Sequence, residues 1–325
     1  MSGRAEAGGG RPLLVALRAL GLGDVLTCLP ALRALAGAFP GHRRVLAGPP
    51  GPGELAVAAG AVDEVLPAEP LAPLAGLPGP VDVAVNLHGR GPQSHRVLRA
   101  LRPRRLVAFG TAGVAGPAWR PGEHEVLRWC RLLEECGIPA DPARLDLDPA
   151  ALPPCREAPG ATIVHPGAAH AARRWPAERW AAVARAEADR GRRVLVTGGR
   201  HEVGLARRVA GRAGLAPDAV RAGETDVAGL AALVATAGRV ACGDTGVAHL
   251  ATALGRPSVV LFGPVPPSEW GPPPDRPHHV ALWAGRRGDP RGERVDPGLL
   301  DIGVAQVVAA LRGLPDRPPV PLAVG

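Results

Sequence analysis

The segment CGDTGVAHLATALGRPSVVLFGP, residues 242–264, places three polar side chains between two apolar runs. Asp244, Thr245 and His249 fall within six residues, after the first run and before the second. The pattern predicts a buried strand, a helix that begins near Thr245, and a second buried strand. This order of elements is typical of an α/β protein, and it raises the question of why polar groups gather at the turn.

Apolar runs followed by amphipathic helices recur along most of the chain. Such alternation is typical of a parallel sheet with crossover helices. We expect strands over 12–17, 44–47, 62–66, 81–87, 104–110, 161–167, 192–199, 239–244 and 257–264. We expect helices over 25–39, 123–137, 176–190, 202–213, 226–237, 246–254 and 299–314.

The alternation lapses at residues 149–160, a Pro- and Ala-rich segment without periodicity that is typical of a linker. We therefore expect two doubly wound, Rossmann-like domains facing across a cleft, with ligands beyond the C-terminal ends of the strands. The expected parts are a flexible tail 1–10, an N-terminal domain 11–148, the linker 149–160, a C-terminal domain 161–314 and a tail 315–325.

The turn at Asp244 has two interpretations. Asp244 or Thr245 caps the following helix, since the first N–H groups of a helix have no internal partners. Alternatively, these groups form an anion site, because the helix N-terminus attracts phosphate, Gly246 allows close approach and His249 lies one turn further on. The combination of these residue types on one turn favours the anion site.

Two further segments carry candidate functional residues. Within VHPGAAHAARRWPAERW, residues 164–180, a Gly- and Ala-rich loop after a strand ends in Arg173, whose guanidinium is suited to phosphate oxygens. In the first domain GLGD supplies Gly21, Gly23 and Asp24, but it is not a complete dinucleotide fingerprint. Asp24 is either a helix cap or a carboxylate that acts as a general base.

Composition narrows the classes of function. The 325-residue chain carries a net charge of +8 and contains no Lys, so all 38 of its Lys-plus-Arg residues are Arg. The arginines are dispersed and aromatic residues make up only 3%, whereas nucleic-acid-binding modules usually show a basic stripe or stacking aromatics. We expect no nucleic-acid partner, and the charge leaves a phosphorylated small molecule or an anionic membrane surface.

The location is expected to be cytoplasmic. The five cysteines include no CxxC pair, which favours a reducing compartment. No run of about twenty apolar residues could span a membrane. Peripheral contact with the inner face of the plasma membrane stays open, because a basic surface attracts anionic headgroups.

Taken together, the three segments resemble glycosyltransferase family 9, the ADP-heptose:lipopolysaccharide heptosyltransferase-like enzymes. The family pattern comprises GxGD…xP, HPG…[KR]xWP and DTGxxHxAxxLGxPxxxLFGPT, which correspond here to residues 21–30, 165–176 and 244–265. Residues 86–95 and 288–302 also resemble family segments. The resemblance covers nearly the whole chain, and its C-terminal motif is highly specific.

The resemblance implies a GT-B fold, with the donor nucleotide in the C-terminal domain, the acceptor in the N-terminal domain and inverting transfer without a metal. Asp24 matches the general base, within an acceptor-side loop that includes Gly21 and Gly23. Arg173 stands where the family usually has Lys facing the donor diphosphate. The remaining matches are the diphosphate-facing residues Thr245, Gly246 and His249 with the acid Asp244 beside them, and the weaker nucleoside-side candidates Glu224 and Thr225.

The resulting hypothesis is a glycosyltransferase that moves a heptose-like sugar from an ADP-linked donor to a hydroxyl of a glycan or glycolipid, with no cofactor beyond this co-substrate. Two alternatives stay open: another nucleotide-sugar donor, or a protein that binds a nucleotide sugar without transferring it. Asp24 favours the enzyme, since a sensor needs no carboxylate there. We expect no metal site, because the DxD-like pair Asp146 and Asp148 lies beside the linker without further ligands.

Overall fold

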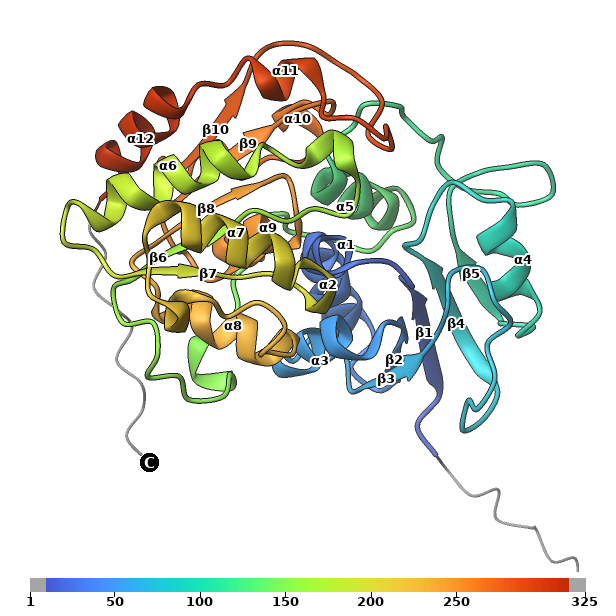
Figure 1. Ribbon diagram of the computed structural model, residues 1–325. Helices are drawn as coiled ribbons and strands as arrows, with labels where there is room; N and C mark the ends of the chain where they lie inside the picture. The colour runs from blue at the N-terminus through green and yellow to red at the C-terminus, as the bar shows by residue number, and fades with distance from the viewer. Residues whose placement is uncertain (1–9, 316–325) are drawn as a thin grey trace, which may run out of the picture. The chain divides into compact units, whose positions relative to one another are not determined.

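The computed structural model describes residues 10–315, which form two five-stranded parallel sheets (Figure 1). The strand order is β3-β2-β1-β4-β5 in the first sheet and β10-β9-β8-β6-β7 in the second. All the strand pairings within both sheets are parallel. The expected α/β class with two Rossmann-like sheets is therefore confirmed. The expected tails, 1–10 and 315–325, lie outside the described residues except for Gly10 and Pro315.

The strands of the first sheet are β1 Leu13–Leu17, β2 Arg43–Gly48, β3 Glu64–Pro67, β4 Val81–Asn86 and β5 Arg105–Val107. Those of the second are β6 Thr162–His165, β7 Val194–Val196, β8 Arg239–Gly243, β9 Ser258–Phe262 and β10 His279–Trp283. The helices are α1 Leu22–Thr27, α2 Leu29–Ala38, α3 Pro50–Ala58, α4 Gln93–Arg99, α5 Glu125–Glu135, α6 Ala177–Ala188, α7 Val203–Ala213, α8 Val227–Thr236, α9 Gly246–Ala253, α10 Pro267–Trp270, α11 Pro297–Leu300 and α12 Val304–Gly313. Four short 3₁₀ helices complete the elements: η1 Pro149–Ala151, η2 Ala171–Arg173, η3 Arg200–Glu202 and η4 Pro217–Ala219. None of the helices between residues 10 and 315 is long and apolar enough to cross a membrane.

The described residues divide into two compact units. Unit 1 holds the chain up to Leu20 together with Cys28–Pro121 and Leu127–Arg144. Unit 2 holds Gly21–Thr27, Gly122–Val126 and the chain from Leu145 onward. The domain ranges expected from the sequence, with their linker 149–160, stay a prediction. The consequence for the site is that α1, which carries Asp24, packs with the second sheet's unit and lies against α9.

The structure differs from the expected elements in three places. The single helix expected over 25–39 is wrong, because α1 and α2 are separate helices with Cys28 between them. Pro30 has no N–H to donate to the carbonyl four residues earlier, but it is tolerated near the start of α2. The helix expected over 299–314 is likewise two, α11 and α12, since Gly303 is extended and caps α12. The edge strand β10 was missed because it is mostly half-buried.

Each sheet reverses its strand order at one point. In unit 2 the reversal lies between β6 and β8, whose pairing brings His165 opposite Cys242. In unit 1 it lies between β1 and β4, whose pairing brings Leu17 opposite Asn86. Ligands of open α/β sheets bind beyond the carboxyl ends of the strands at such a switch point. Functional side chains are therefore expected at these two switch points.

The switch point of unit 1 holds a buried cation. Arg18 follows β1 and is only 1% exposed. Its guanidinium donates to the carbonyl oxygen of Leu87 at 2.6 Å and lies 5.0 Å from the ring centroid of Trp129. His88 follows β4, and burial together with the charge of Arg18 lowers the pKa of its imidazole to about 4. The imidazole is therefore neutral at pH 7.

We predict that His88→Gln makes the free energy of unfolding less sensitive to acid. Below pH 6.5 the unfolded chain binds a proton at His88 while the folded chain does not, so stability falls as the pH drops from 6.5 toward about 4. Glutamine removes this contribution, which we place on the order of 1 kcal/mol after allowing for solvent screening. Urea unfolding at pH 7 and pH 5 measures it, with the exposed His201→Gln as control. An unchanged difference between the two pH values in His88→Gln would contradict the prediction.

Candidate active site

The switch point of unit 2 brings together one cation and one carboxylate from segments distant in sequence. Arg173 ends the 3₁₀ helix η2 in the loop after β6, and Asp244 directly follows β8. The Nη1 atom of Arg173 lies 3.4 Å from Oδ2 of Asp244 and 3.5 Å from its backbone oxygen. The structure thus places two of the predicted site residues in contact.

Asp244 is held in a place that disfavours its charge. It is 5% exposed, and burial raises the pKa of its carboxyl above the ordinary value. The positive charge of Arg173 acts in the opposite direction, and the negative charge of Asp24 adds to the rise. The ionised form of Asp244 is therefore disfavoured by burial, and the neighbouring guanidinium of Arg173 is what offsets part of that cost.

Arg173 keeps hydrogen-bonding capacity beyond this pair. Its two contacts with Asp244 are long, and its buried Nε atom has no partner among the described residues. Buried donors are nearly always satisfied in native proteins, so an unpaired N–H on a cation indicates a place for an acceptor. A phosphate oxygen is the acceptor best matched to a guanidinium.

The N-terminus of α9 lies next to this pair. Thr245 caps the helix, its hydroxyl oxygen accepting from the N–H of Val247 at 3.3 Å. His249 is on the first turn of α9, and its ring packs edge-to-face against Trp270 with centroids 5.8 Å apart. The helix N-terminus, the hydroxyl of Thr245 and the guanidinium of Arg173 together make a cationic and donor-rich environment.

Asp24 belongs to the same unit as this turn. It is in α1, where its carboxylate accepts from the backbone N–H of Gly21 at 3.1 Å. Gly23 and Gly246 are the points of closest approach between α1 and α9, since a Cβ built on either would lie 2.7 Å from an atom of the other helix. The predicted residues Asp24, Gly21, Gly23, Arg173, Asp244, Thr245, Gly246 and His249 therefore all lie in one unit.

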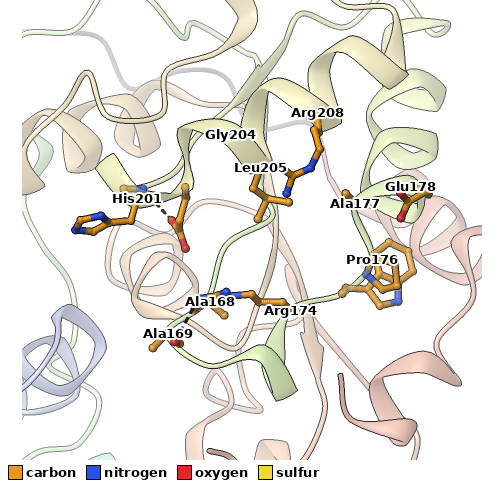
Figure 2. Close-up of a pocket in the computed structure, with 13 residues that line it drawn as sticks. Ala168, Ala169, Arg174, Pro176, Ala177, Glu178, His201, Gly204, Leu205 and Arg208 are labelled. Carbon is orange, nitrogen blue, oxygen red and sulfur yellow. Dashed lines mark hydrogen bonds between the residues drawn. The ribbon is translucent and has the colours of Figure 1, made fainter. Parts of the chain in front are cut away.

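A cavity of about 710 Å³ opens beside the loop that leads to Arg173 (Figure 2). One wall is the chain after β6, with Ala168, Ala169 and Arg174, and the other is the chain after β7, with Gly199 and Glu202. It continues between the first turns of α6 and α7. The side chain of Arg174 is hydrogen-bonded within the loop, since it donates to the carbonyl oxygens of Ala168 and Ala169.

The sequence reasoning missed Glu202. Its Oε2 accepts from the N–H of Gly199 at 2.8 Å and lies 3.9 Å from Nε2 of His165, whose pKa is lowered by burial. Gly167 makes room for it, since a Cβ there would lie 2.1 Å from the carboxylate. The signal was an acid three residues after the Gly-Gly pair that ends the strand expected over 192–199.

Two nucleoside-side candidates lie elsewhere. Glu224 is exposed, and its carboxylate pairs with Arg221 at 3.6 Å. Neither Glu224 nor Thr225 lines the cavity. The preceding Gly223 nevertheless packs on the first residue of α7, because its added Cβ would lie 2.9 Å from Val203. Their assignment to the nucleoside stays a prediction.

Among residues 10–315, no group of three or more His, Cys, Asp or Glu side chains is arranged to hold a metal ion. The DxD-like carboxylates have protein partners: Asp146 pairs with Arg276 at 2.7 Å, and Asp148 caps η1 through the N–H of Ala150.

The fold has been seen before in solved structures. One is the glycosyl transferase family 9 protein from Veillonella parvula, at 19% identity over 93% of this chain and 96% of that chain, with a TM-score of 0.73. Another is E. coli ADP-heptose LPS heptosyltransferase II, at 19% identity over 92% and 97% of the two chains, with a TM-score of 0.73. A third is E. coli heptosyltransferase WaaC with ADP, at 20% identity over 92% and 98%, with a TM-score of 0.69. No curated protein matches the sequence.

These similarities identify the GT-B class of glycosyltransferases, which has two Rossmann-like domains. The model of glycosyltransferase family 9 (heptosyltransferase) matches residues 116–295, more than half of the chain. The chain belongs to this family and is a glycosyltransferase.

We predict that Arg173→Gln destabilises the protein more at pH 8 than at pH 5. Loss of the cation raises the pKa of the Asp244 carboxyl further, so the folded state binds a proton that the unfolded chain releases, and stability falls as the pH rises. At pH 8 we expect a loss of about 2–3 kcal/mol, as for a broken buried ion pair that is partly exposed on one side.

The measurement is urea unfolding at both pH values. In Arg173→Gln/Asp244→Asn the carboxylate at position 244 is absent. The additional pH dependence of the free energy of unfolding should therefore vanish. Equal losses at pH 5 and pH 8 in the single variant would show that Arg173 does not support the charge of Asp244.

Proposed function

We propose that this protein is an inverting, metal-independent glycosyltransferase that moves a heptose-like sugar from an ADP-linked donor to a hydroxyl of a glycan or glycolipid. The observation that carries the proposal is the Arg173–Asp244 pair at the switch point of unit 2, with the buried Nε of Arg173 still unpaired. The names of the E. coli proteins with this fold supply the ADP-heptose chemistry.

In the proposed reaction Asp24 is the general base. Its carboxylate accepts the proton of the acceptor hydroxyl, and the hydroxyl oxygen attacks the anomeric carbon of the donor sugar. The bond from this carbon to the diphosphate breaks on the opposite face, so the configuration inverts. Asp24 is supported in this role by its place on α1, which packs against the turn that carries Thr245.

The leaving diphosphate gains negative charge as the bond breaks. We assign its stabilisation to Arg173, the N-terminus of α9, the hydroxyl of Thr245 and the ring of His249. Such fixed donors act where charge develops and need no reorganisation during the reaction. They supply the charge stabilisation that a divalent ion provides in metal-dependent transferases.

The cavity lined by Ala168, Arg174 and Glu202 is the place that we propose for the nucleoside. Glu202 stands after β7, the strand next to β6, and its carboxylate is held by the N–H of Gly199. In Rossmann-like sheets an acid after the neighbouring strand accepts hydrogen bonds from the ribose hydroxyls. We therefore propose that Glu202 takes this role at the end of the cavity nearest Ala168.

The partners follow from this chemistry. The donor is a nucleotide sugar and the acceptor a glycan or lipid-linked glycan, which we assign to unit 1 with its own switch point at Arg18 and His88. A nucleotide-sugar donor supports a cytoplasmic location. The net charge of +8 supports peripheral contact with anionic lipid at the inner face of the plasma membrane.

We predict that Asp24→Asn abolishes transfer without abolishing nucleotide binding. Asparagine keeps the size of the side chain but cannot take the proton, so kcat should fall by about 10²–10⁴-fold. Transfer from ADP-sugars is followed in the presence of EDTA and of magnesium, and the binding of ADP is followed separately. A variant that keeps the wild-type kcat would exclude Asp24 as the base, and activity that requires magnesium would overturn metal independence.

We predict that a nucleoside diphosphate stabilises the protein and that Glu202→Gln weakens its binding about tenfold, the loss of about 1.4 kcal/mol of charged hydrogen bonding. We test ADP, UDP, GDP and CDP by thermal unfolding, each at a hundred times its dissociation constant. The nucleotide with the correct base should raise the free energy of unfolding by about 2.7 kcal/mol. Binding of pyrophosphate should be unchanged in Glu202→Gln, since it has no ribose.

Glu178→Gln is the matched control, because Glu178 lines the same cavity and its carboxylate is engaged by Arg212 instead. Stabilisation by a nucleotide other than ADP would replace the donor and keep the mechanism. No stabilisation by any of the four would contradict the assignment of the site to a diphosphate.

A further inference from the structure

We propose that Gly23 is a positioning residue, which sets the helix that carries the general base against the helix that holds the leaving group. This role rests on the proposed function, and it places Gly23 in unit 2 rather than in an acceptor-side loop. In unit 2, α1 packs against α9, although the two helices are far apart in sequence.

The contact at Gly23 leaves no space for a side chain. A Cβ on Gly23 would lie 2.7 Å from Cδ2 and 3.3 Å from Nε2 of the His249 ring, and 3.5 Å from the Cα of Gly246. Distances under 3.0 Å are not tolerated, so either the ring or the backbone of α1 would have to move. Gly23 lies inside α1 without a positive φ, so the contact, and not backbone conformation, is what requires glycine there.

The opposite side of the contact is equally close. A Cβ on Gly246 would lie 2.7 Å from Cβ of Leu22 and 3.1 Å from the backbone nitrogen of Gly23. Two glycines thus face each other across the helices, and each allows the other chain to approach at backbone distance. The separation of α1 from the first turn of α9 is therefore set by the absence of two side chains.

The imidazole of His249 has little freedom to yield. It packs edge-to-face against Trp270, with ring centroids 5.8 Å apart. Trp270 belongs to a segment that is tied down, since the following Gly271 accepts from His124 at 2.9 Å and Glu269 pairs with Arg287 at 2.6 Å. A methyl group on Gly23 would thus have to displace either this aromatic contact or α1.

A displacement of α1 carries Asp24 with it. The helix has only six residues, and two hydrogen bonds hold it together. The N–H of Gly21 donates to the Asp24 carboxylate, and the hydroxyl of Thr27 donates to the Asp24 carbonyl oxygen. It therefore shifts as one piece, and the distance from the base to the diphosphate turn changes with it. A misplacement of about 1 Å in such a constellation can cost on the order of 10²-fold in rate.

The test is a comparison of Gly23→Ala with Gly37→Ala. Gly37 is also inside a helix, α2, but an added Cβ meets nothing within 4 Å, so this variant reports the general effect of alanine in a helix. We expect Gly23→Ala to lower kcat by about 10- to 100-fold, and Gly37→Ala to leave it unchanged. Affinity for the nucleoside diphosphate should change less than about threefold in Gly23→Ala, because Arg173, Thr245 and Glu202, which we assign to its binding, are not on α1.

A double-variant cycle with His249→Ala shows whether the loss arises at this contact. Once the ring is absent, the added methyl group has nothing to strike, so kcat of Gly23→Ala/His249→Ala should match that of His249→Ala alone. If Gly23→Ala does not fold, the double variant should recover the folded state. Additive losses in kcat, or no recovery of folding, would overturn the proposal, as would a wild-type kcat in Gly23→Ala.

Failure of the proposed function has a different signature. A wild-type protein that transfers no sugar from any nucleotide sugar would contradict the enzymatic role before Gly23 is considered. An active wild-type protein with an equally active Gly23→Ala would instead leave the function in place and remove only the positioning role.

Discussion

Arg173 and Asp244 meet because the chain leaves β6 and β8 at neighbouring positions of a parallel sheet, on the two sides of the strand-order reversal. Burial makes the ionised form of Asp244 costly, and the guanidinium is what offsets that cost. The carboxylate in turn keeps the arginine at the switch point instead of in solvent. The same cation that stabilises the buried acid is thus held at the proposed diphosphate site, with its Nε donor unpaired.

The strands could be predicted because a parallel sheet buried on both faces needs continuous apolar runs, and LLVAL and SVVLF are such runs. The boundaries of the helices were predicted less accurately than the strands. Leucine periodicity continues through residues 25–39, but it does not record that Pro30 cannot donate a hydrogen bond, and so it joined α1 to α2. β10 lies at the sheet edge with four of its five residues only half-buried, so its apolar signal was too short to separate from the loop before it.

Some residues of the candidate site could likewise be predicted from the sequence, and others could not. Asp244, Thr245, Gly246 and His249 are adjacent in sequence, so a helix turn is enough to bring them together, and the pattern alone pointed to them. Glu202 and Gly167 become neighbours only through the pairing of β6 with β7, and the HPG motif that contains Gly167 does not reveal its contact with Glu202. Glycine carries a further ambiguity. Gly246 was expected to admit a phosphate, which stays a prediction, and the structure shows α1 in close approach to it.

The place of Asp24 has a mechanistic consequence. Sequence order puts it directly after the first strand of the first sheet, but its helix packs on α9, within the unit that holds Arg173 and Thr245. The spacing between the proposed base and the proposed leaving-group site is therefore governed by side-chain packing inside one unit. Because packed interiors deform little, the packing within this unit keeps the spacing constant. In the proposed reaction, the geometry of the bond that forms and of the bond that breaks is then fixed by the packing of α1 on α9.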